Sequence, residues 1–214
     1  MSLFEDFKQT GKHLAPARSI PHHVRSSVRF VIFSALALAL AGGSRVGAQS
    51  PQEDDRKQAR AVRVSDGAIR VDGRLDDEAW SAVPMLTDFT QKEPVEGVEP
   101  TDRMEVRFAY DDTALYVGAR MFSSAPIQAP MSRRDGANQA EFMMVSLDTY
   151  LDRRTASSFG VTASGVRLDR YHPTDDTRAD DGFNPVWEAQ TSIDGEGWSA
   201  ELWIPFSQLR FNER

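Results

Sequence analysis

Hydrophobic and polar residues alternate over much of residues 62–211, and turn-forming residues interrupt the alternation about every ten positions. Residues 104–110 alternate in this way, residues 111–113 are Asp-Asp-Thr, and residues 115–121 resume the alternation. A period of two is typical of a strand with one buried face. A short polar break between two such stretches is typical of a hairpin. We therefore predict a β-hairpin over these residues.

Two more hairpins are predicted further along the chain. The second covers residues 159–168, and Gly165 in its turn can take the positive φ that other residues avoid. The third covers residues 187–204, with its turn at 194–197. Pro205 ends its second strand, because proline has no amide hydrogen for the ladder.

The remaining elements are a buried strand and two short helical turns. Residues 142–148 are almost continuously apolar, which favours a strand covered on both faces. Asp76 is predicted to cap a helical turn over residues 77–80, and residues 207–209 can form another turn. The pattern predicts an all-β fold, an antiparallel β-sandwich of jelly-roll type with about eight or nine strands.

The first 48 residues have the pattern of a secretion signal. Basic residues precede an apolar run at 30–41, and a small-residue site ends at Ala48, where we expect cleavage. The run is shorter than the roughly 20 residues of a spanning helix, although an uncleaved anchor remains the alternative. Residues 49–61 are polar and are predicted to form a flexible leader to the domain. We expect export to the periplasm, outer membrane or medium, with no transmembrane helix in the mature domain.

Charge and composition exclude several classes of protein. The chain has 25 basic and 32 acidic residues. Residues 1–48 hold six of the basic and two of the acidic ones, which leaves 19 and 30, a net charge of −11, for residues 49–214. A nucleic-acid-binding domain needs the opposite sign. The chain has no cysteine, which excludes disulfides, thiol nucleophiles and cysteine-ligated metals. His172 is the one histidine beyond residue 48, which argues against a multi-histidine metal centre and a Ser-His-Asp triad.

Three blocks of sequence resemble the family-nine carbohydrate-binding module. They are residues 69–80 (IRVDGRLDDEAW), 106–118 (VRFAYDDTALYVG) and 197–206 (GWSAELWIPF). The blocks come in the order of the family and span nearly all of the predicted domain over residues 62–211. The resemblance implies a β-sandwich that binds sugars in a shallow site walled by aromatic rings, with calcium supporting the loops in some members.

The middle of the chain more closely resembles one subgroup, found at the N-terminus of large exported bacterial proteins. Arg133-Arg134-Asp135 and residues 152–155 carry this likeness. In that subgroup the module precedes a long C-terminal region of unknown role, and residues 212–214 would begin it. The implied function is a non-catalytic carbohydrate-binding module of a larger protein involved in polysaccharide binding or breakdown. Any glycoside hydrolase activity would then belong to the rest of that polypeptide.

The likeness departs from sugar-binding members at one point. Those members have a tryptophan before the acidic residue that opens the central strand, whereas residues 135–141 contain no aromatic residue. This favours an alternative function, an interaction or gating domain of an outer-membrane, β-rich protein that has lost sugar binding. A hydrolase in its own right is a third hypothesis, but no carboxylate pair stands out as catalytic.

Sugar sites combine aromatic rings with charged hydrogen-bonding groups. The candidate ligand-binding residues are Trp203, Tyr171, Arg134, Asp135 and Glu141. Trp203 shares a polar face with Ser199 and Glu201, where it either stacks on a ligand or is covered by another part of the protein. Tyr171 shares a polar face with Arg167 and Asp169.

The remaining tryptophans are predicted to have a packing role, and the arginines have two interpretations. Trp80, Trp187 and Trp198 are predicted to pack in the core, because they alternate with apolar residues or close a short turn. Arg133, Arg134, Arg153 and Arg154 either grip an anionic or hydroxylated ligand or form surface ion pairs.

An acidic loop offers a candidate cation site. Its residues are Asp175, Asp176, Asp180 and Asp181. Hard oxygen ligands in a flexible loop suit Ca²⁺. The loop lacks the fixed spacing of an EF-hand, so a solvated acidic loop is the alternative.

Overall fold

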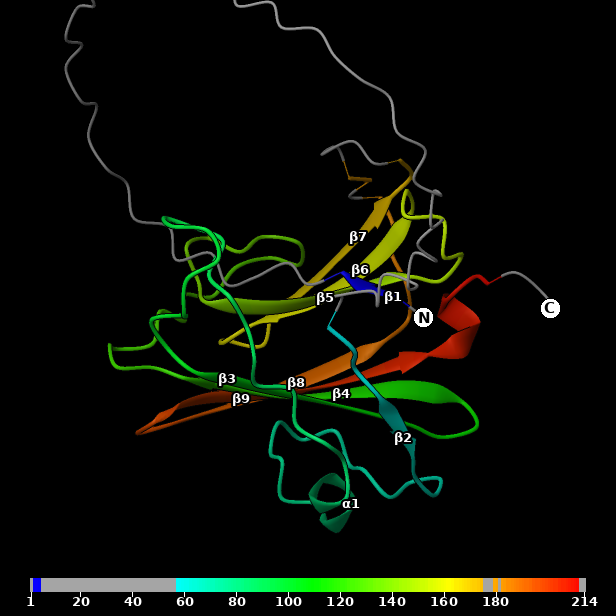
Figure 1. Cartoon of the computed structure of the whole chain (residues 1–214), viewed down its shortest axis with the longest axis horizontal. Coiled ribbons are helices and arrows are strands. Elements are labelled where there is room, and N and C mark those ends of the chain that lie inside the picture. Colours follow the sequence, from blue (N-terminus) through cyan, green and yellow to red (C-terminus); the bar gives the residue numbers. More distant parts are fainter. Residues whose placement is uncertain (1, 5–56, 175–178, 181, 212–214) are drawn as a thin grey trace, which may run out of the picture. The chain divides into compact units, whose positions relative to one another are not determined.

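The computed structural model describes residues 2–4, 57–174, 179–180 and 182–211 and shows a sandwich of two β-sheets (Figure 1). The strands are β1 (Ser2–Phe4), β2 (Ala61–Arg63), β3 (Met104–Tyr110), β4 (Ala114–Phe122), β5 (Phe142–Asp148), β6 (Ala156–Thr162), β7 (Arg167–His172), β8 (Glu188–Asp194) and β9 (Gly197–Pro205). One sheet has the order β1-β5-β6-β7 and the other β2-β3-β4-β9-β8. The predicted all-β sandwich is confirmed.

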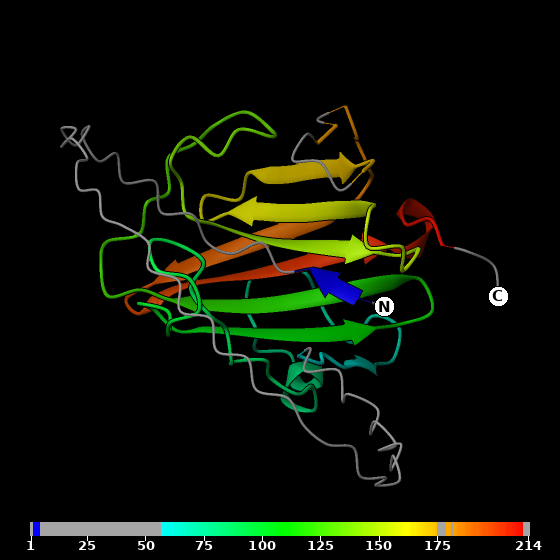
Figure 2. The same ribbon diagram turned by 45° about the horizontal axis from the view of Figure 1, so that its top comes forward.

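All three predicted hairpins are present (Figure 2). β3 pairs with β4, β6 with β7 and β8 with β9, each antiparallel. Gly165 has a φ of 84° in the β6–β7 turn, as its place in the sequence predicts. β9 ends at Pro205, and β5 is the predicted strand over 142–148. Local alternation and turn chemistry therefore specify most of the ladder.

Two three-residue strands were not expected. β2 begins at Ala61, the last residue of the predicted leader, and runs parallel to β3, so the five-stranded sheet is not wholly antiparallel. β1 pairs antiparallel with β5, with Ser2 opposite Asp148, although it lies in the predicted signal segment. Three residues are too few to show a period of two. Residues 30–48, with the apolar run and the expected cleavage site, lie outside the described residues, as do residues 212–214.

The two helical turns differ slightly from the prediction. The helix α1 (Glu78–Ser81) has Asp77, not Asp76, at its N-cap position. The Asp77 side chain makes no cap hydrogen bond and instead accepts one from the Arg70 amide at 2.8 Å. A long-range contact has thus replaced the local cap. The final turn is the 3₁₀ helix η1 (Phe206–Gln208). The described part of the chain contains no helix with the length and apolarity to cross a bilayer.

The main core lies between the two sheets. The inward-facing side chains of β3, β4 and β9 pack against those of β5 and β6. Trp187 and Trp198 are fully buried there, and Trp187 meets Phe159 edge-on with ring centroids 5.4 Å apart. The predicted core positions of these two tryptophans are confirmed.

A second apolar cluster covers the outer face of the five-stranded sheet, where α1 lies in Figure 1. Trp80, 2% exposed, packs there with Tyr116 and Ile69. Gly118 makes this approach possible, because a Cβ at that position would lie 2.8 Å from a methyl of Leu75 and 3.0 Å from the Trp80 ring. The predicted packing role of Trp80 is confirmed.

Candidate functional site

The candidate site lies along β7, the edge strand of the four-stranded sheet. The register places Asp169 opposite Phe159 and Tyr171 opposite Ser157. Directly paired residues share a face, and Phe159 is in the main core. Asp169 and Tyr171 therefore lie on the inward face of β7. The alternation alone had suggested a polar outer face, and this prediction is wrong. Asp169 is completely buried.

Asp169 forms a partly buried ion pair with Arg134. The Arg134 Nη2 and Nε donate to Asp169 Oδ1 at 2.6 and 3.0 Å, and Trp187 Nε1 donates to the same oxygen at 3.1 Å. Arg134 Nη2 also donates to the Pro185 carbonyl at 3.2 Å. The Arg134 side chain remains 34% exposed. The guanidinium thus covers the carboxylate and presents its outer side to solvent.

Asp135 ties the preceding loop to β7. Its Oδ1 accepts a hydrogen bond from the Asp169 amide at 3.0 Å, and its own amide donates to the Arg167 carbonyl at 3.0 Å. Asp135, Asn138 and Gln139 have φ values of 65°, 44° and 63°. Residues other than glycine seldom adopt this left-handed region of φ. The resulting backbone strain persists where surrounding contacts enforce it. The loop is therefore held in one shape beside the ion pair.

The second oxygen of Asp169 has no donor. Among the described residues, Oδ2 is the one buried side-chain polar atom without a hydrogen-bond partner. Buried acceptors are nearly always paired, and an unpaired one costs about 1–3 kcal/mol. A water molecule or a ligand hydroxyl that enters beside Arg134 would relieve this cost. This oxygen is the strongest chemical signal in the site.

An aromatic pair adjoins the ion pair. The rings of Tyr171 and Phe183 lie 6.0 Å apart, and both are partly exposed. Phe183 also contacts Phe159, with centroids 6.1 Å apart. The backbones of Tyr171 and Asp180 form an antiparallel bridge, which brings Asp180 alongside the end of β7.

We call this group the β7-edge site, comprising Arg134, Asp135, Asp169, Tyr171 and Phe183. It offers aromatic surface and a half-exposed guanidinium, with a buried carboxylate oxygen that lacks a donor behind them. Aromatic rings and charged groups of this kind hold polyhydroxylated ligands. The sequence predicts three of the five. Asp169 and Phe183 were not among the predicted ligand-binding residues. Only the pairing of β6 with β7 shows that Asp169 faces the core rim.

Glu141 lies apart from the β7-edge site. It is 4% exposed, and its Oε2 accepts a hydrogen bond from the Trp198 indole at 3.1 Å. Its Oε1 accepts one from the Gln128 amide at 3.3 Å. These contacts hold the start of β5 against the core, and Glu141 is not brought together with Arg134, Asp135 and Tyr171.

Trp203 is also remote from the site. It lies opposite Tyr116 in the register, on the outer face of the five-stranded sheet, as the alternation predicts. That face is covered by the second apolar cluster, and the partly buried Trp203 ring packs against it. Trp203 therefore packs on residues 62–83 and lies on the other sheet from the β7-edge site.

The acidic loop can be assessed at one position only. Asp180 is described, and its Oδ1 accepts a hydrogen bond from the Gly182 amide at 2.8 Å. Asp175, Asp176 and Asp181 lie outside the described residues. Within the described ranges, no group of three or more His, Asp or Glu side chains is arranged to hold a metal ion.

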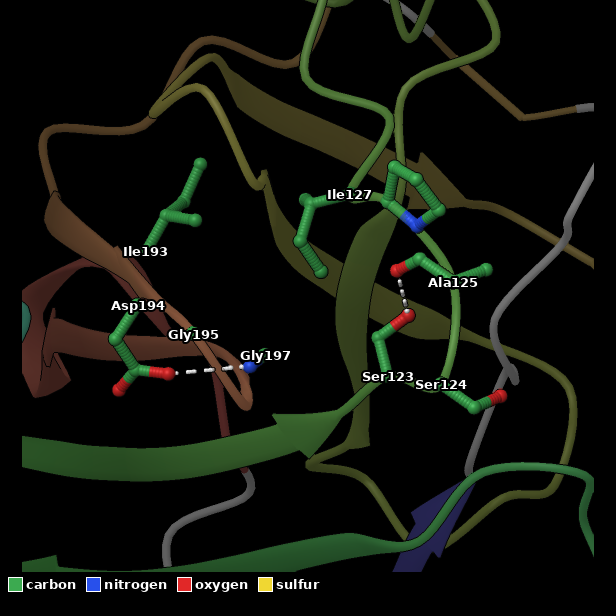
Figure 3. Close-up of a pocket in the computed structure, with 9 residues that line it drawn as sticks. Ser123, Ser124, Ala125, Ile127, Ile193, Asp194, Gly195 and Gly197 are labelled. Carbon is green, nitrogen blue, oxygen red and sulfur yellow. Dashed lines mark hydrogen bonds between the residues drawn. The ribbon is translucent and has the colours of Figure 1, made fainter.

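A shallow groove at the other end of the sandwich was not expected from the sequence (Figure 3). It has a volume of about 460 Å³ and lies between residues 123–127 and the β8–β9 turn. Ile127 and Ile193 come from its two sides, and no aromatic residue lines it. The Asp194 carboxylate at its rim is bound by Arg120 and by the amides of the turn. The groove lacks the aromatic surface that the β7-edge site has.

Comparison with known proteins supports the fold assignment. Neither a protein-family profile nor a curated protein sequence matches the chain. Among solved structures, a family-nine carbohydrate-binding module from Caldicellulosiruptor kristjanssonii in complex with glucose is similar, with a TM-score of 0.50, 18% identity, and 72% of this chain and 73% of that chain covered. The chain therefore has the sandwich fold of such modules.

Two further structures are similar over comparable lengths. A family-nine module from the same organism in complex with cellotriose has a TM-score of 0.47 and 17% identity, covering 68% of this chain and 67% of its own. A protein from Bacteroides uniformis has a TM-score of 0.48 and 13% identity, with 70% and 75% covered.

Proposed function

We propose that the chain is a non-catalytic carbohydrate-binding module whose ligand binds at the β7-edge site. The observation that carries the proposal is the Tyr171–Phe183 aromatic pair beside a buried carboxylate with a free oxygen. The apolar face of a sugar ring stacks on the aromatic surface. A sugar hydroxyl, directly or through a water molecule, supplies the donor that Asp169 Oδ2 lacks, and Arg134 donates to a second hydroxyl.

The fold adds support, because the similar solved module was determined in complex with glucose. Glucose and cellotriose, the ligands named for the two similar modules, are therefore the first ligands to test. The N-terminal pattern of residues 1–48 supports export, and the sequence likeness supports a place in a larger polypeptide. Calcium binding by the acidic loop that contains Asp180 is part of the same proposal.

The proposal is tested by titrating the full chain with glucose and cellotriose, with and without Ca²⁺, by calorimetry. We expect saturable binding that Tyr171→Ala weakens by about tenfold. The contact between a sugar ring and an aromatic side chain contributes about 1 kcal/mol or more to the binding free energy. Tyr110→Ala, at a partly exposed tyrosine on β3, is the matched control and should bind as the parent does. Absence of binding by a folded sample would contradict the proposed function. An equal loss of affinity in both variants would contradict the assignment of binding to the β7-edge site.

A second candidate function is an interaction domain that contacts another part of the same polypeptide. Large exposed apolar side chains favour it, notably Val186 at 71% and Phe211 at 52% exposure. The Val186 amide donates to Gln208 Oε1 at 2.9 Å. The segments that carry Val186 and Phe211 are therefore neighbours. A folded protein that binds no sugar in the titration would favour this candidate.

A further inference from the structure

Two segments that carry three arginines meet at the end of the sandwich where β6 begins and β7 ends. Arg153 and Arg154 lie in the β5–β6 connection, and Arg210 follows η1. The Thr149 hydroxyl donates to the Arg210 carbonyl, which joins the two segments. All three arginines are exposed, and within the described ranges none of them forms an ion pair. Unpaired arginines stand out in a domain of net charge −11.

Two acidic residues flanking Arg153, Asp148 at the end of β5 and Asp152 in the β5–β6 connection, accept hydrogen bonds from backbone amides. The buried Asp148 carboxylate accepts from the amides of Asp152 and Arg153 at 3.2 and 2.8 Å. Asp152 Oδ1 accepts from the amides of Arg154 and Thr155, both at 2.8 Å. These bonds lower the pKa of Asp152. Both carboxylates shape the loop, and the guanidinium groups remain available to a ligand.

The same contacts hold the loop in a strained shape. Leu151 and Arg153 both have a φ of 57°, in the left-handed region that non-glycine residues seldom adopt. Strain of this kind persists only where surrounding contacts enforce it. The arginine-bearing loop is therefore preorganised, which lowers the entropic cost of gripping a ligand.

This basic end is next to the aromatic pair of the β7-edge site. The register places Ser157 opposite Tyr171 and Ala156 opposite His172. Arg154 is two residues before Ala156, so the arginine-bearing loop leads directly into the strand that pairs with Tyr171. The backbone that carries Arg153 and Arg154 is therefore continuous with the strand beside the aromatic pair.

We infer that the ligand of the β7-edge site is an anionic glycan that carries carboxylate groups. This inference rests on the proposed function and names its ligand class. Arginine binds carboxylates through paired, charge-assisted hydrogen bonds. A uronic-acid chain would place sugar rings on Tyr171 and Phe183 and its carboxylates against Arg153, Arg154 and Arg210. The net negative charge of the domain opposes this only weakly, since charges more than about 8 Å away are screened at physiological salt.

The test is calorimetric titration of the full chain with oligogalacturonate and with a neutral cello-oligosaccharide of equal length, at low and at high salt. We expect oligogalacturonate to bind about tenfold more tightly than the neutral oligomer at low salt, with the difference shrinking at high salt. The double variant Arg153→Gln, Arg154→Gln should lose this advantage and keep its affinity for the neutral oligomer. The double variant Arg60→Gln, Arg74→Gln makes the same change of charge at exposed positions in another part of the chain and should behave as the parent does.

The outcomes separate this inference from the proposed function. Equal binding of both oligomers by the parent overturns the inference and leaves sugar binding standing. Equal loss in the two double variants also overturns it, because net charge alone would then explain the preference. Binding of oligogalacturonate that Tyr171→Ala does not affect overturns the β7-edge site and supports the arginines. Binding of neither oligomer overturns both.

Discussion

Glu201 and Asp169 are both fully buried carboxylates that accept a hydrogen bond from a tryptophan indole, yet their surroundings differ. Glu201 Oε1 accepts from Trp80 at 2.8 Å, and Oε2 accepts from the amides of Asp72 and Gly73 at 2.8 and 2.9 Å. Both of its oxygens are satisfied. Asp169 receives all its side-chain donors on one oxygen, and the other has none.

The difference separates a structural carboxylate from a candidate ligand group. Glu201 fastens residues 72–80 to the outer face of the five-stranded sheet, and burial raises its pKa although three donors oppose that shift. Glu141 resembles it, with a donor on each oxygen. Asp169 keeps an unused acceptor beside an exposed arginine and two aromatic rings. Completeness of hydrogen bonding, more than burial, distinguishes the two kinds of site.

The largest effect is expected from Glu201→Gln. The indole and the two backbone amides all donate to the two oxygens of Glu201. Glutamine has one oxygen and one NH₂ group, so at least one of these buried N–H groups would face another donor. We expect a loss of about 3 kcal/mol in the free energy of unfolding, measured by urea denaturation. Glu188→Gln, at an exposed position on β8, should change it by less than about 0.5 kcal/mol. A loss under 1 kcal/mol for Glu201→Gln would contradict the structural role of this carboxylate.

Trp203→Ala tests the same side of the molecule. The ring is partly buried against the second apolar cluster, so its removal should cost about 2 kcal/mol in unfolding free energy. Because Trp203 lies on the other sheet from Tyr171, sugar affinity should not change. Loss of sugar binding by a folded Trp203→Ala protein would place the sugar site on the outer face of the five-stranded sheet and contradict the β7-edge site.

Asp169→Asn is expected to cost less stability than Glu201→Gln but to affect binding. The asparagine oxygen can still accept from Arg134 and Trp187, while its NH₂ group occupies the place of the unpaired oxygen. We expect a loss of about 1 kcal/mol in stability from the weakened charge pair and about tenfold in sugar affinity. Asp112→Asn, in the exposed pair with Arg63, is the control and should leave affinity unchanged. Unchanged affinity in Asp169→Asn would show that a buried water suffices there.

The smallest effect concerns the exposed Asp194–Arg120 pair, which sharpens the contrast with buried carboxylates. The hydrogen bonds from Arg120 lower the pKa of Asp194 from 3.8 to about 2. A lowered pKa in the folded state stabilises the fold above pH 4, and this contribution is lost as the pH falls from about 4 to 2. Denaturation at a series of pH values should therefore show a shallower acid slope for Asp194→Asn than for the parent. Identical slopes would mean that the pair is broken in solution.

The sequence predicts the ladder and the core more successfully than the site. The hairpins β3–β4, β6–β7 and β8–β9 follow from alternation and turn residues within about 20 positions, because register is a local property there. The burial of Trp187 and Trp198 follows from the same pattern. Of the residues predicted to bind a ligand, Arg134, Asp135 and Tyr171 lie together, whereas Glu141 and Trp203 lie elsewhere.

Fold class and the positions of most strands were determined by the sequence itself, through the period of two and the turns that interrupt it. The tertiary structure decided which polar groups are satisfied. Glu201 meets donors about 125 residues earlier in the chain, and Asp169 meets Arg134 from a loop 35 residues before it. Alternation assigns a side chain to a face of a strand, but only the packing of distant segments determines whether that face is covered and which buried oxygen is left without a donor.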